Sequence, residues 1–122
     1  MLNNTKELNN IADVWIKAHK SDNFIDSELD WTLPSSDPNK CLDVILKVLE
    51  KIDTVSDNDL FSALAAGPLE DLLHENGEFI VDRIDIFARQ NPDFRRLLNG
   101  VWDSEVDESV KSKLSKYMTE RW

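Results

Sequence analysis

The apolar residues of this chain recur at steps of three and four positions, and this period constrains its fold more than any other feature. Between residues 5 and 20, for example, Leu8, Ile11, Ala12, Trp15 and Ile16 fall on one face of a helix, with polar residues on the opposite face. No stretch alternates between apolar and polar residues for long enough to predict a β-strand. The pattern therefore predicts an all-α protein.

Proline, glycine and capping residues divide this pattern into about six to seven short helices. The expected helices are 5–20, 38–52, one that Ser56 and Asp59 open as a capping box and Gly67 ends, 68–77, 78–90, 92–98 and a last one that Asp107 caps. Residues 21–40 lose the helical period, so we expect a long ordered loop there. Short helices joined by tight corners are typical of stacked helix pairs or of an irregular orthogonal bundle.

The length and composition favour one helical domain over residues 1–122. A chain of 122 residues with 41% hydrophobic content has enough apolar material for a single core. The one cysteine, Cys41, excludes an internal disulfide and a cysteine-rich zinc site. No apolar run approaches the roughly 20 residues of a membrane span, and the first ten residues lack the features of a signal peptide. We therefore expect a cytoplasmic protein.

The charge of the chain is strongly negative and unevenly distributed. Fourteen Lys and Arg residues against twenty-four Asp and Glu residues give a formal net charge of -10, which argues against nucleic acid and anionic membranes as partners. Between Ile52 and Asp82 there is no Lys or Arg, while eight residues are acidic: Asp53, Asp57, Asp59, Glu70, Asp71, Glu75, Glu78 and Asp82. A basic protein is the partner that this surface would attract.

A second acidic segment mixes carboxylates with large apolar side chains. Between Ser21 and Asn39 there are five acidic residues and no basic one, and the segment also contains Phe24 and Trp31. Carboxylates can steer a basic partner while an aromatic ring anchors the contact, but Trp31 could equally fold back and cap the core. The predicted partner-binding residues are Asp22, Phe24, Asp26, Glu28, Asp30, Trp31, Asp57, Asp59, Glu70, Asp71, Glu75 and Glu78.

The segment LAAGPLEDLL, from Leu64 to Leu73, predicts a sharp corner between two helices. Gly67 can adopt a positive φ where one helix stops, and Pro68 fixes φ for the next helix. Glu70 and Asp71 would then lie in the first turn, where carboxylates interact with the free amide groups and the helix dipole. We expect Arg95 or Arg96 to pair with one of these acids, and Trp102 to be a core or helix-packing aromatic.

This corner, followed downstream by Phe94-Arg95 and by LNGVW at residues 98–102, resembles a family of uncharacterised bacterial domains. That family is marked by an A-A-G-P-L-E-D-L-L corner and an F-R-x-x-L-x-G-V-W segment, and the resemblance covers about residues 57–102. The resemblance implies an all-helical bacterial protein. It implies no activity, so no catalytic residue is transferred from it.

Catalytic motifs are missing from the sequence. It contains no G-x-S-x-G, no glycine-rich phosphate loop and no H-E-x-x-H motif. Glu70 and His74 have the i, i+4 spacing of two metal ligands, but a solvated acidic face explains them more simply. Cys41 lies within an expected helix and is better explained as a packing residue than as a nucleophile. We therefore predict no catalytic residue, no cofactor and no metal site.

These features favour a non-enzymatic binding protein. The most concrete hypothesis is an immunity protein that neutralises a basic bacterial toxin such as a nuclease, because a phosphate-binding active site is cationic and would attract an acidic cover. The alternative is a helical adaptor that docks a peptide or helix in a groove. A metal-dependent enzyme built around Glu70 and His74 is the third and weakest hypothesis.

Overall fold

A computed structural model describes residues 4–20, 28–102, 104 and 106–120 of the chain, and within these residues it confirms the all-α prediction. They contain no β-strand. The helices are α1 (Asn4–Lys20), α2 (Glu28–Trp31), α3 (Leu33–Ser36), α4 (Pro38–Lys51), α5 (Asn58–Leu64), the π-helical turn η1 (Ala65–Leu69), α6 (Glu70–Gln90), α7 (Pro92–Leu98), α8 (Glu108–Leu114) and the 3₁₀ turn η2 (Ser115–Tyr117). No helix in this part of the chain combines the length and the apolar character needed to cross a membrane.

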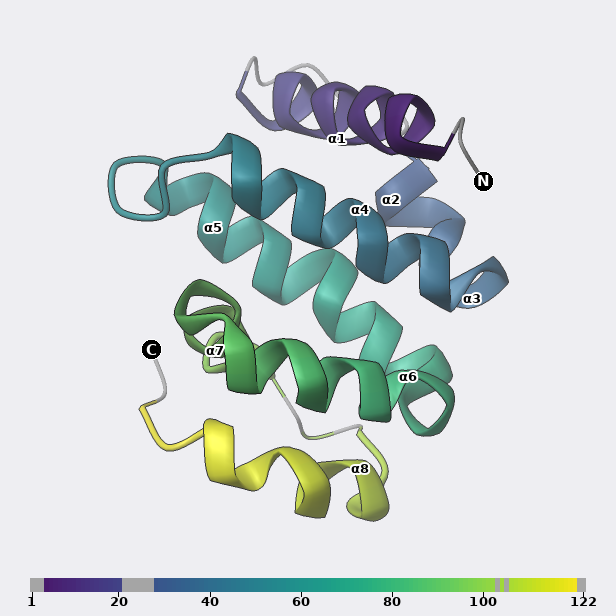
Figure 1. The fold of residues 1–122 in the computed structure, drawn as a ribbon, viewed down its shortest axis with the longest axis vertical. Coiled ribbons are helices and arrows are strands. Elements are labelled where there is room, and N and C mark those ends of the chain that lie inside the picture. Colours follow the sequence, from purple (N-terminus) through teal and green to yellow (C-terminus); the bar gives the residue numbers. More distant parts are fainter. Residues whose placement is uncertain (1–3, 21–27, 103, 105, 121–122) are drawn as a thin grey trace.

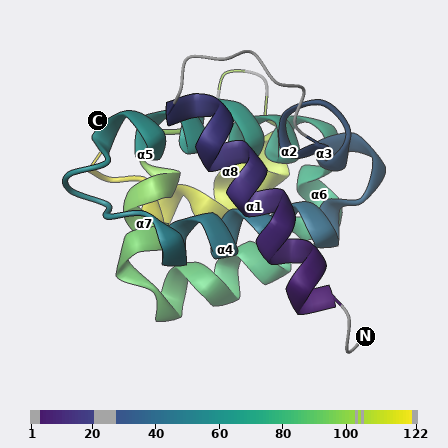
Figure 2. The ribbon, with the colours of Figure 1, turned by 90° about the horizontal axis from the view of Figure 1, so that it is seen from above.

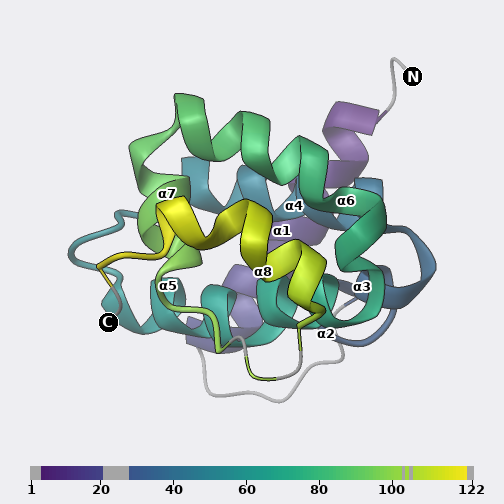
Figure 3. The ribbon, with the colours of Figure 1, turned by 90° about the horizontal axis from the view of Figure 1, so that it is seen from below.

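The helices are stacked along the long axis of the molecule (Figure 1). Helix α1 forms one end and packs across α4, as the view from above shows (Figure 2). The α5–η1–α6 segment lies beneath α4, and α8 covers α6 at the opposite end, nearest the viewer in Figure 3. Each layer therefore contacts its neighbours directly, as α1 contacts α4 and α8 contacts α6.

Local capping explains where two of the predicted helices begin. Asp37 accepts a hydrogen bond from the Lys40 amide at 3.1 Å, and Pro38 occupies the first turn of α4. Asn91 accepts from the Phe94 amide at 3.1 Å, and Pro92 begins α7 in the same way. The bounds of α7 are those expected from the sequence, and α4 ends one residue earlier than expected.

The predicted loop at residues 21–40 is wrong in its second half. Residues 28–36 form α2 and α3, and Leu29 and Leu33 are buried in the core. Two buried leucines on so short a segment are enough to hold it helical against α1, α4 and α6. Asp22, Phe24 and Asp26 lie outside the described residues, as do the side chains of Glu28 and Trp31.

The predicted corner at Gly67 is also wrong, because the chain continues as a helix from Asn58 to Asn76. Gly67 lies inside η1 without a positive φ, and the Glu70 amide donates to the Ala65 carbonyl five residues back. The wider π turn accommodates Pro68, whose ring would otherwise clash with a carbonyl of the preceding turn. Gly67 has no Cβ to collide with the proline ring, so the residue before Pro68 keeps helical torsions.

The change of direction occurs instead at Asn76, where the backbone leaves helical torsions (φ -139°, ψ 30°). The Asn76 side-chain amide donates to the Pro34 carbonyl at 2.8 Å, which ties the kink to α3. Gly77 follows, and a Cβ at this position would lie 3.1 Å from a methyl group of Val110 in α8. Gly77 therefore permits close packing of α6 on α8. The predicted break between helices 68–77 and 78–90 is confirmed as a kink at Asn76, one residue before Gly77.

One core runs through the stack. Trp15, Phe61 and Phe94 are its largest fully buried side chains, and Cys41 is buried among them, as predicted. Burial raises the pKa of the Cys41 thiol to about 12. Phe79, which follows the Asn76 kink in α6, is 64% exposed.

Candidate functional site

The site is built on the solvent-facing side of the helix that runs from Asn58 to Asn76. Asp71 and Glu75 are exposed on it and Glu70 is half-buried. Asp30, from α2, approaches the same helix, since a Cβ on Gly67 would lie 3.8 Å from its carboxylate oxygen. We call Asp30, Glu70, Asp71 and Glu75 the acidic patch.

The helix dipole does not explain these carboxylates. Because α5, η1 and α6 are continuous, Glu70 and Asp71 do not lie at a free helix end, and no side chain caps the start of α6. The predicted capping role of Glu70 and Asp71 is therefore wrong. The two acids occupy the middle of a helix, where no unpaired amide groups compensate their charge.

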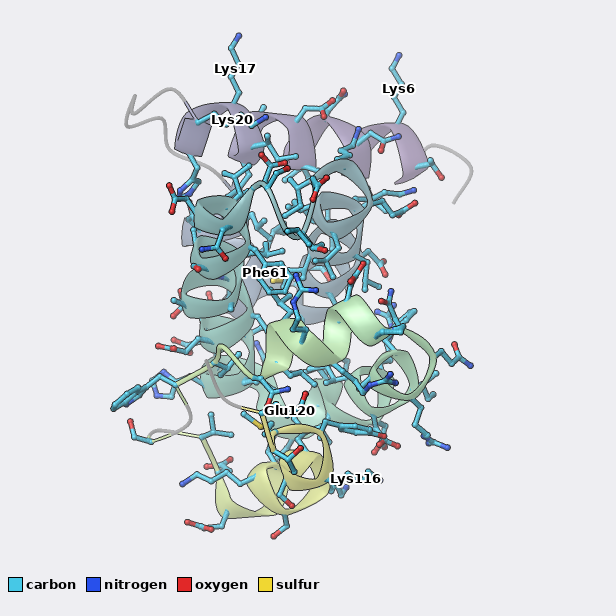
Figure 4. All side chains as sticks on the ribbon, turned by 90° about the vertical axis from the view of Figure 1, so that its left-hand side faces the viewer. Lys6, Lys17, Lys20, Phe61, Lys116 and Glu120 are labelled. Atoms are coloured by element: carbon cyan, nitrogen blue, oxygen red, sulfur yellow. The ribbon has the colours of Figure 1, made fainter. Side chains whose placement is uncertain are left out.

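The ion pairs that lysines and arginines form among the described residues involve acids outside the patch. Their partners are Glu7, Asp13, Asp43, Glu50, Asp82, Asp85, Asp93 and Glu108. The lysines labelled in Figure 4 lie towards the two ends of the stack, with Lys6, Lys17 and Lys20 on α1 and Lys116 beside α8. Within the described residues, no Lys or Arg forms an ion pair with the acidic patch.

The surroundings of Asp71 raise the pKa of its carboxyl group. Its pKa is raised, first because neighbouring atoms shield the carboxylate from water and then because Glu70, Asp30 and Glu75 are close. His74 opposes this shift, but does not cancel it. Asp71 also has no hydrogen-bond partner among the described residues, so its charge is a cost to the folded chain.

Glu70 joins the two segments that the sequence had singled out, but not in the predicted way. Its Oε1 accepts a hydrogen bond from the Trp102 backbone amide at 3.0 Å. Arg95 instead donates to the Ala88 and Arg89 carbonyls. The Arg96 guanidinium stacks over the Phe61 ring, which is labelled in Figure 4, at 4.6 Å.

Trp102 is the largest difference between expectation and structure at this site. It was predicted to pack in the core, yet 69% of it is exposed. Its neighbour Val101 is fully buried, and Asn99 is held by hydrogen bonds from its amide to the Arg95 and Tyr117 carbonyls. The chain is thus anchored just before Trp102, and the indole projects outward from a well-held backbone.

A hollow of about 280 Å³ lies beside the exposed indole. Its lining combines one aromatic residue, two carboxylates and one imidazole with a small polar and an apolar residue: Trp102, Glu70, Asp71, His74, Ser104 and Val106. Two separate parts of the chain contribute to it, the start of α6 and the segment between α7 and α8. The arrangement can bind a cationic group beside an aromatic surface.

Asp30 is shared between the patch and the packing of α1. Its Oδ1 accepts from the Trp15 indole at 2.9 Å, and its Oδ2 lies 3.2 Å from His19 Nε2. His19 also stacks on Trp15, with ring centroids 4.3 Å apart. His19 therefore joins α1 to α2.

The other predicted acids lie away from the hollow. Asp57 accepts from the Asp53 amide at 2.8 Å and stabilises the turn before α5, so the expected Ser56–Asp59 capping box is wrong. Asp57 and Asp59 line a different depression together with Lys20. Glu78 accepts from Ser109 at 3.3 Å and shares a hollow with Lys113. Basic neighbours therefore moderate their charge.

The geometry offers no obvious catalytic or metal-binding centre within the described residues. No group of three or more His, Cys, Asp and Glu side chains there is arranged to hold a metal ion. Glu70, one of the two residues with metal-ligand spacing, uses an oxygen to bind the Trp102 amide. Two carboxylates of the patch and the exposed Trp102 ring line the same hollow.

Comparison with known proteins defines the family. A family of unknown function, DUF6869, matches residues 11–122. The chain belongs to this family. No curated protein and no solved structure matches it significantly. The resemblance stated from residues 57–102 is thus extended to almost the whole chain, and the match to DUF6869 includes every described residue of the acidic patch and the hollow.

Two site residues in this DUF6869 member were missed or misassigned by sequence reasoning. Trp102 was assigned to the core because tryptophan is usually well buried. Its exposure could have been suspected from its place after Gly100 and before the acidic run at residues 103–108. The proximity of Asp30 to Glu70 and Asp71 has no local signal, since it depends on how α2 packs against η1.

Proposed function

We propose that this protein is a protein-binding domain whose partner is basic, and most concretely an immunity protein that neutralises a basic bacterial toxin such as a nuclease. The observation that carries the proposal is the acidic patch, which forms no ion pair with a lysine or arginine among the described residues. An exposed aromatic ring beside it supplies the kind of anchor that concentrates binding energy.

Electrostatics explains why a basic partner would bind the acidic patch. Carboxylates placed close together without a lysine or arginine partner among the described residues cost stability in the free protein, because like charges repel. A basic partner would relieve that repulsion and would be steered towards the patch during encounter. A nuclease is a suitable partner class, since its phosphate-binding surface carries the complementary charge.

Capture of the partner at two salt concentrations tests the proposal. The protein is immobilised and exposed to lysate of its source organism at about 50 and 500 mM salt, a range over which screening becomes strong. We expect a basic protein to be retained at low salt and to be released or weakened at high salt. The captured protein is then expressed in a test bacterium, where it should be toxic alone and harmless with this domain.

A matched pair of charge-reversal variants tests whether the partner binds at the acidic patch. Asp71→Lys/Glu75→Lys reverses two charges of the patch and should abolish capture. Glu50→Lys/Glu108→Lys makes the same change in net charge on exposed residues of α4 and α8 and should preserve it. If no basic protein is captured, or if both variants lose it equally, the proposal is wrong.

One observation favours a second candidate, the helical adaptor. Phe79 and Ile86 are both exposed on α6, and their spacing of seven places them on one side of the helix. Two apolar side chains so placed could contact a partner helix. In that case Phe79→Ala would remove capture, while Asp71→Lys/Glu75→Lys would leave it intact.

A further inference from the structure

The Trp102 ring is exposed to solvent although its backbone is held in place by the fold. An indole placed in water forgoes the free energy that burial of a large aromatic ring contributes. The hydrogen bond from its backbone amide to Glu70 and the buried Val101 before it hold this segment against the helix. The ring therefore faces solvent from an ordered backbone, which lowers the entropy cost of using it as a contact.

The surroundings of the ring are complementary to a guanidinium group. Glu70 binds the Trp102 amide through Oε1, so its other oxygen is not used in that bond, and Asp71 has no hydrogen-bond partner among the described residues. Both carboxylates and the indole line the same hollow of about 280 Å³. A planar cation can stack on an indole and donate two parallel hydrogen bonds to a carboxylate at once.

We infer that the hollow between Trp102 and the Glu70 and Asp71 carboxylates receives an arginine side chain of the partner. This inference rests on the proposed function, and it specifies the contact that anchors the complex. Arginine fits better than lysine, because the ammonium group of lysine is compact, strongly hydrated and unable to stack as a plane. An anionic ligand would be repelled by the Glu70 and Asp71 carboxylates that line the hollow.

The probe is a hexa-arginine peptide, with a hexa-lysine peptide of equal charge as the control ligand. Binding at about 50 mM salt is followed by ¹⁹F NMR of protein labelled with 5-fluorotryptophan, with the Trp102 resonance assigned from Trp102→Phe. We expect hexa-arginine to shift the Trp102 resonance and to bind roughly fivefold more tightly than hexa-lysine, the size of an exposed cation–π contact.

Variants separate this contact from general attraction between opposite charges. Trp102→Ala should remove the preference for arginine over lysine, and Trp102→Phe should retain part of it. Phe79→Ala, which removes another exposed aromatic ring, should leave the preference unchanged. Asp71→Asn should weaken hexa-arginine more than Glu50→Gln does, although both remove one charge.

Three outcomes would overturn the inference: equal affinity for the two peptides, a preference that persists in Trp102→Ala, or shifts confined to other tryptophans. Its failure is distinguishable from failure of the proposed function. If the basic partner is captured normally by Trp102→Ala, the protein binds a basic partner through another contact and only the inference about arginine is wrong. If no basic partner is captured by the unmodified protein, the proposed function itself is wrong.

Discussion

Gly67 shows how a single missing Cβ decides the path of the chain. It precedes Pro68 within a helical turn, where a Cβ would meet the proline ring. We predict that Gly67→Ala destabilises the protein by about 1 kcal/mol, and that in a Pro68→Ala background the same change stabilises it by about 0.5–1 kcal/mol through helix propensity. Urea denaturation of the four proteins in this double-mutant cycle measures the coupling.

A positive φ at Gly67 would give a different result. Alanine would then be unfavourable with either residue at position 68, and the coupling would vanish. The space beside Gly67 does not interfere with the test, because the new Cβ would make only an ordinary contact with Asp30 at 3.8 Å.

Asp71 is a residue whose charge opposes folding. Its pKa is raised in the folded protein by shielding from water and by Glu70, Asp30 and Glu75, so the folded state holds the proton more tightly than the unfolded state. The contribution of Asp71 to stability is therefore present at low pH and is lost as pH rises from the ordinary pKa of 3.8 through the raised value. We predict that Asp71→Asn raises the melting temperature at pH 7.

This advantage of Asp71→Asn should disappear near pH 3, where Asp71 is protonated in both states. Asp85 provides the opposite control. Hydrogen bonds from Tyr117 and then Arg89 lower its pKa to about 2, so its stabilisation is present above about pH 4 and is lost as pH falls towards 2. If Asp71→Asn lowered the melting temperature at neutral pH, Asp71 would have a stabilising role that this structure does not contain. If Asp71→Asn stabilises the protein and also weakens binding, Asp71 serves function at a cost in stability.

At the scale of elements, Asp30 connects α1 to α2 through the buried Trp15. Asp30→Ala would leave the Trp15 indole without its acceptor, which costs about 1–3 kcal/mol when the donor is buried. Asp30→Asn keeps an oxygen in the same place and should cost less. We predict this order of stability in chemical denaturation, with faster amide hydrogen exchange in α1 for Asp30→Ala.

Equal losses in Asp30→Ala and Asp30→Asn would point to the 3.2 Å contact with His19, because both variants remove the carboxylate charge. Asp13→Ala serves as the control on α1, since Asp13 is exposed and pairs only with Lys51. Loss of such a surface ion pair should change stability by less than about 1 kcal/mol.

At the scale of the whole molecule, the acidic patch should orient a basic partner, because it forms no ion pair with a lysine or arginine among the described residues. We predict that the association rate with the captured partner falls as salt rises from about 50 to 500 mM, while the dissociation rate changes less. Trp102→Ala should mainly raise the dissociation rate, since a central aromatic anchor acts after encounter. Surface plasmon resonance measures both rates.

An association rate that is indifferent to salt would mean that the charge of the protein serves solubility and not steering. The sequence-based hypothesis that Trp31 anchors a partner stays a prediction, because its side chain lies outside the described residues. Measuring the melting temperature and binding kinetics of Trp31→Ala would separate an interface anchor from a core cap.

The sequence alone was sufficient to predict the helices that depend on local interactions. The start of α4 at Pro38 and both bounds of α7 follow from a capping side chain, a proline and a 3.6-residue period, all within a few positions of each other. The acidic character of residues 21–39 and 52–82 was equally readable. For the candidate site, this identified Asp30, Glu70, Asp71 and Glu75 as candidates, but not which of them lie together.

Tertiary structure decided the rest, because the outcome depended on contacts between distant segments. Gly67-Pro68 is compatible with either a corner or a widened helix, and the burial of Leu64, Ala65 and Leu69 against the core favours the helix. Trp102 could have been buried, but anchoring of the neighbouring Val101 turns its ring outward beside Glu70. Local patterns determine which residues are helical, whereas only the packing of the helices determines which charges meet, and so where the candidate binding site forms.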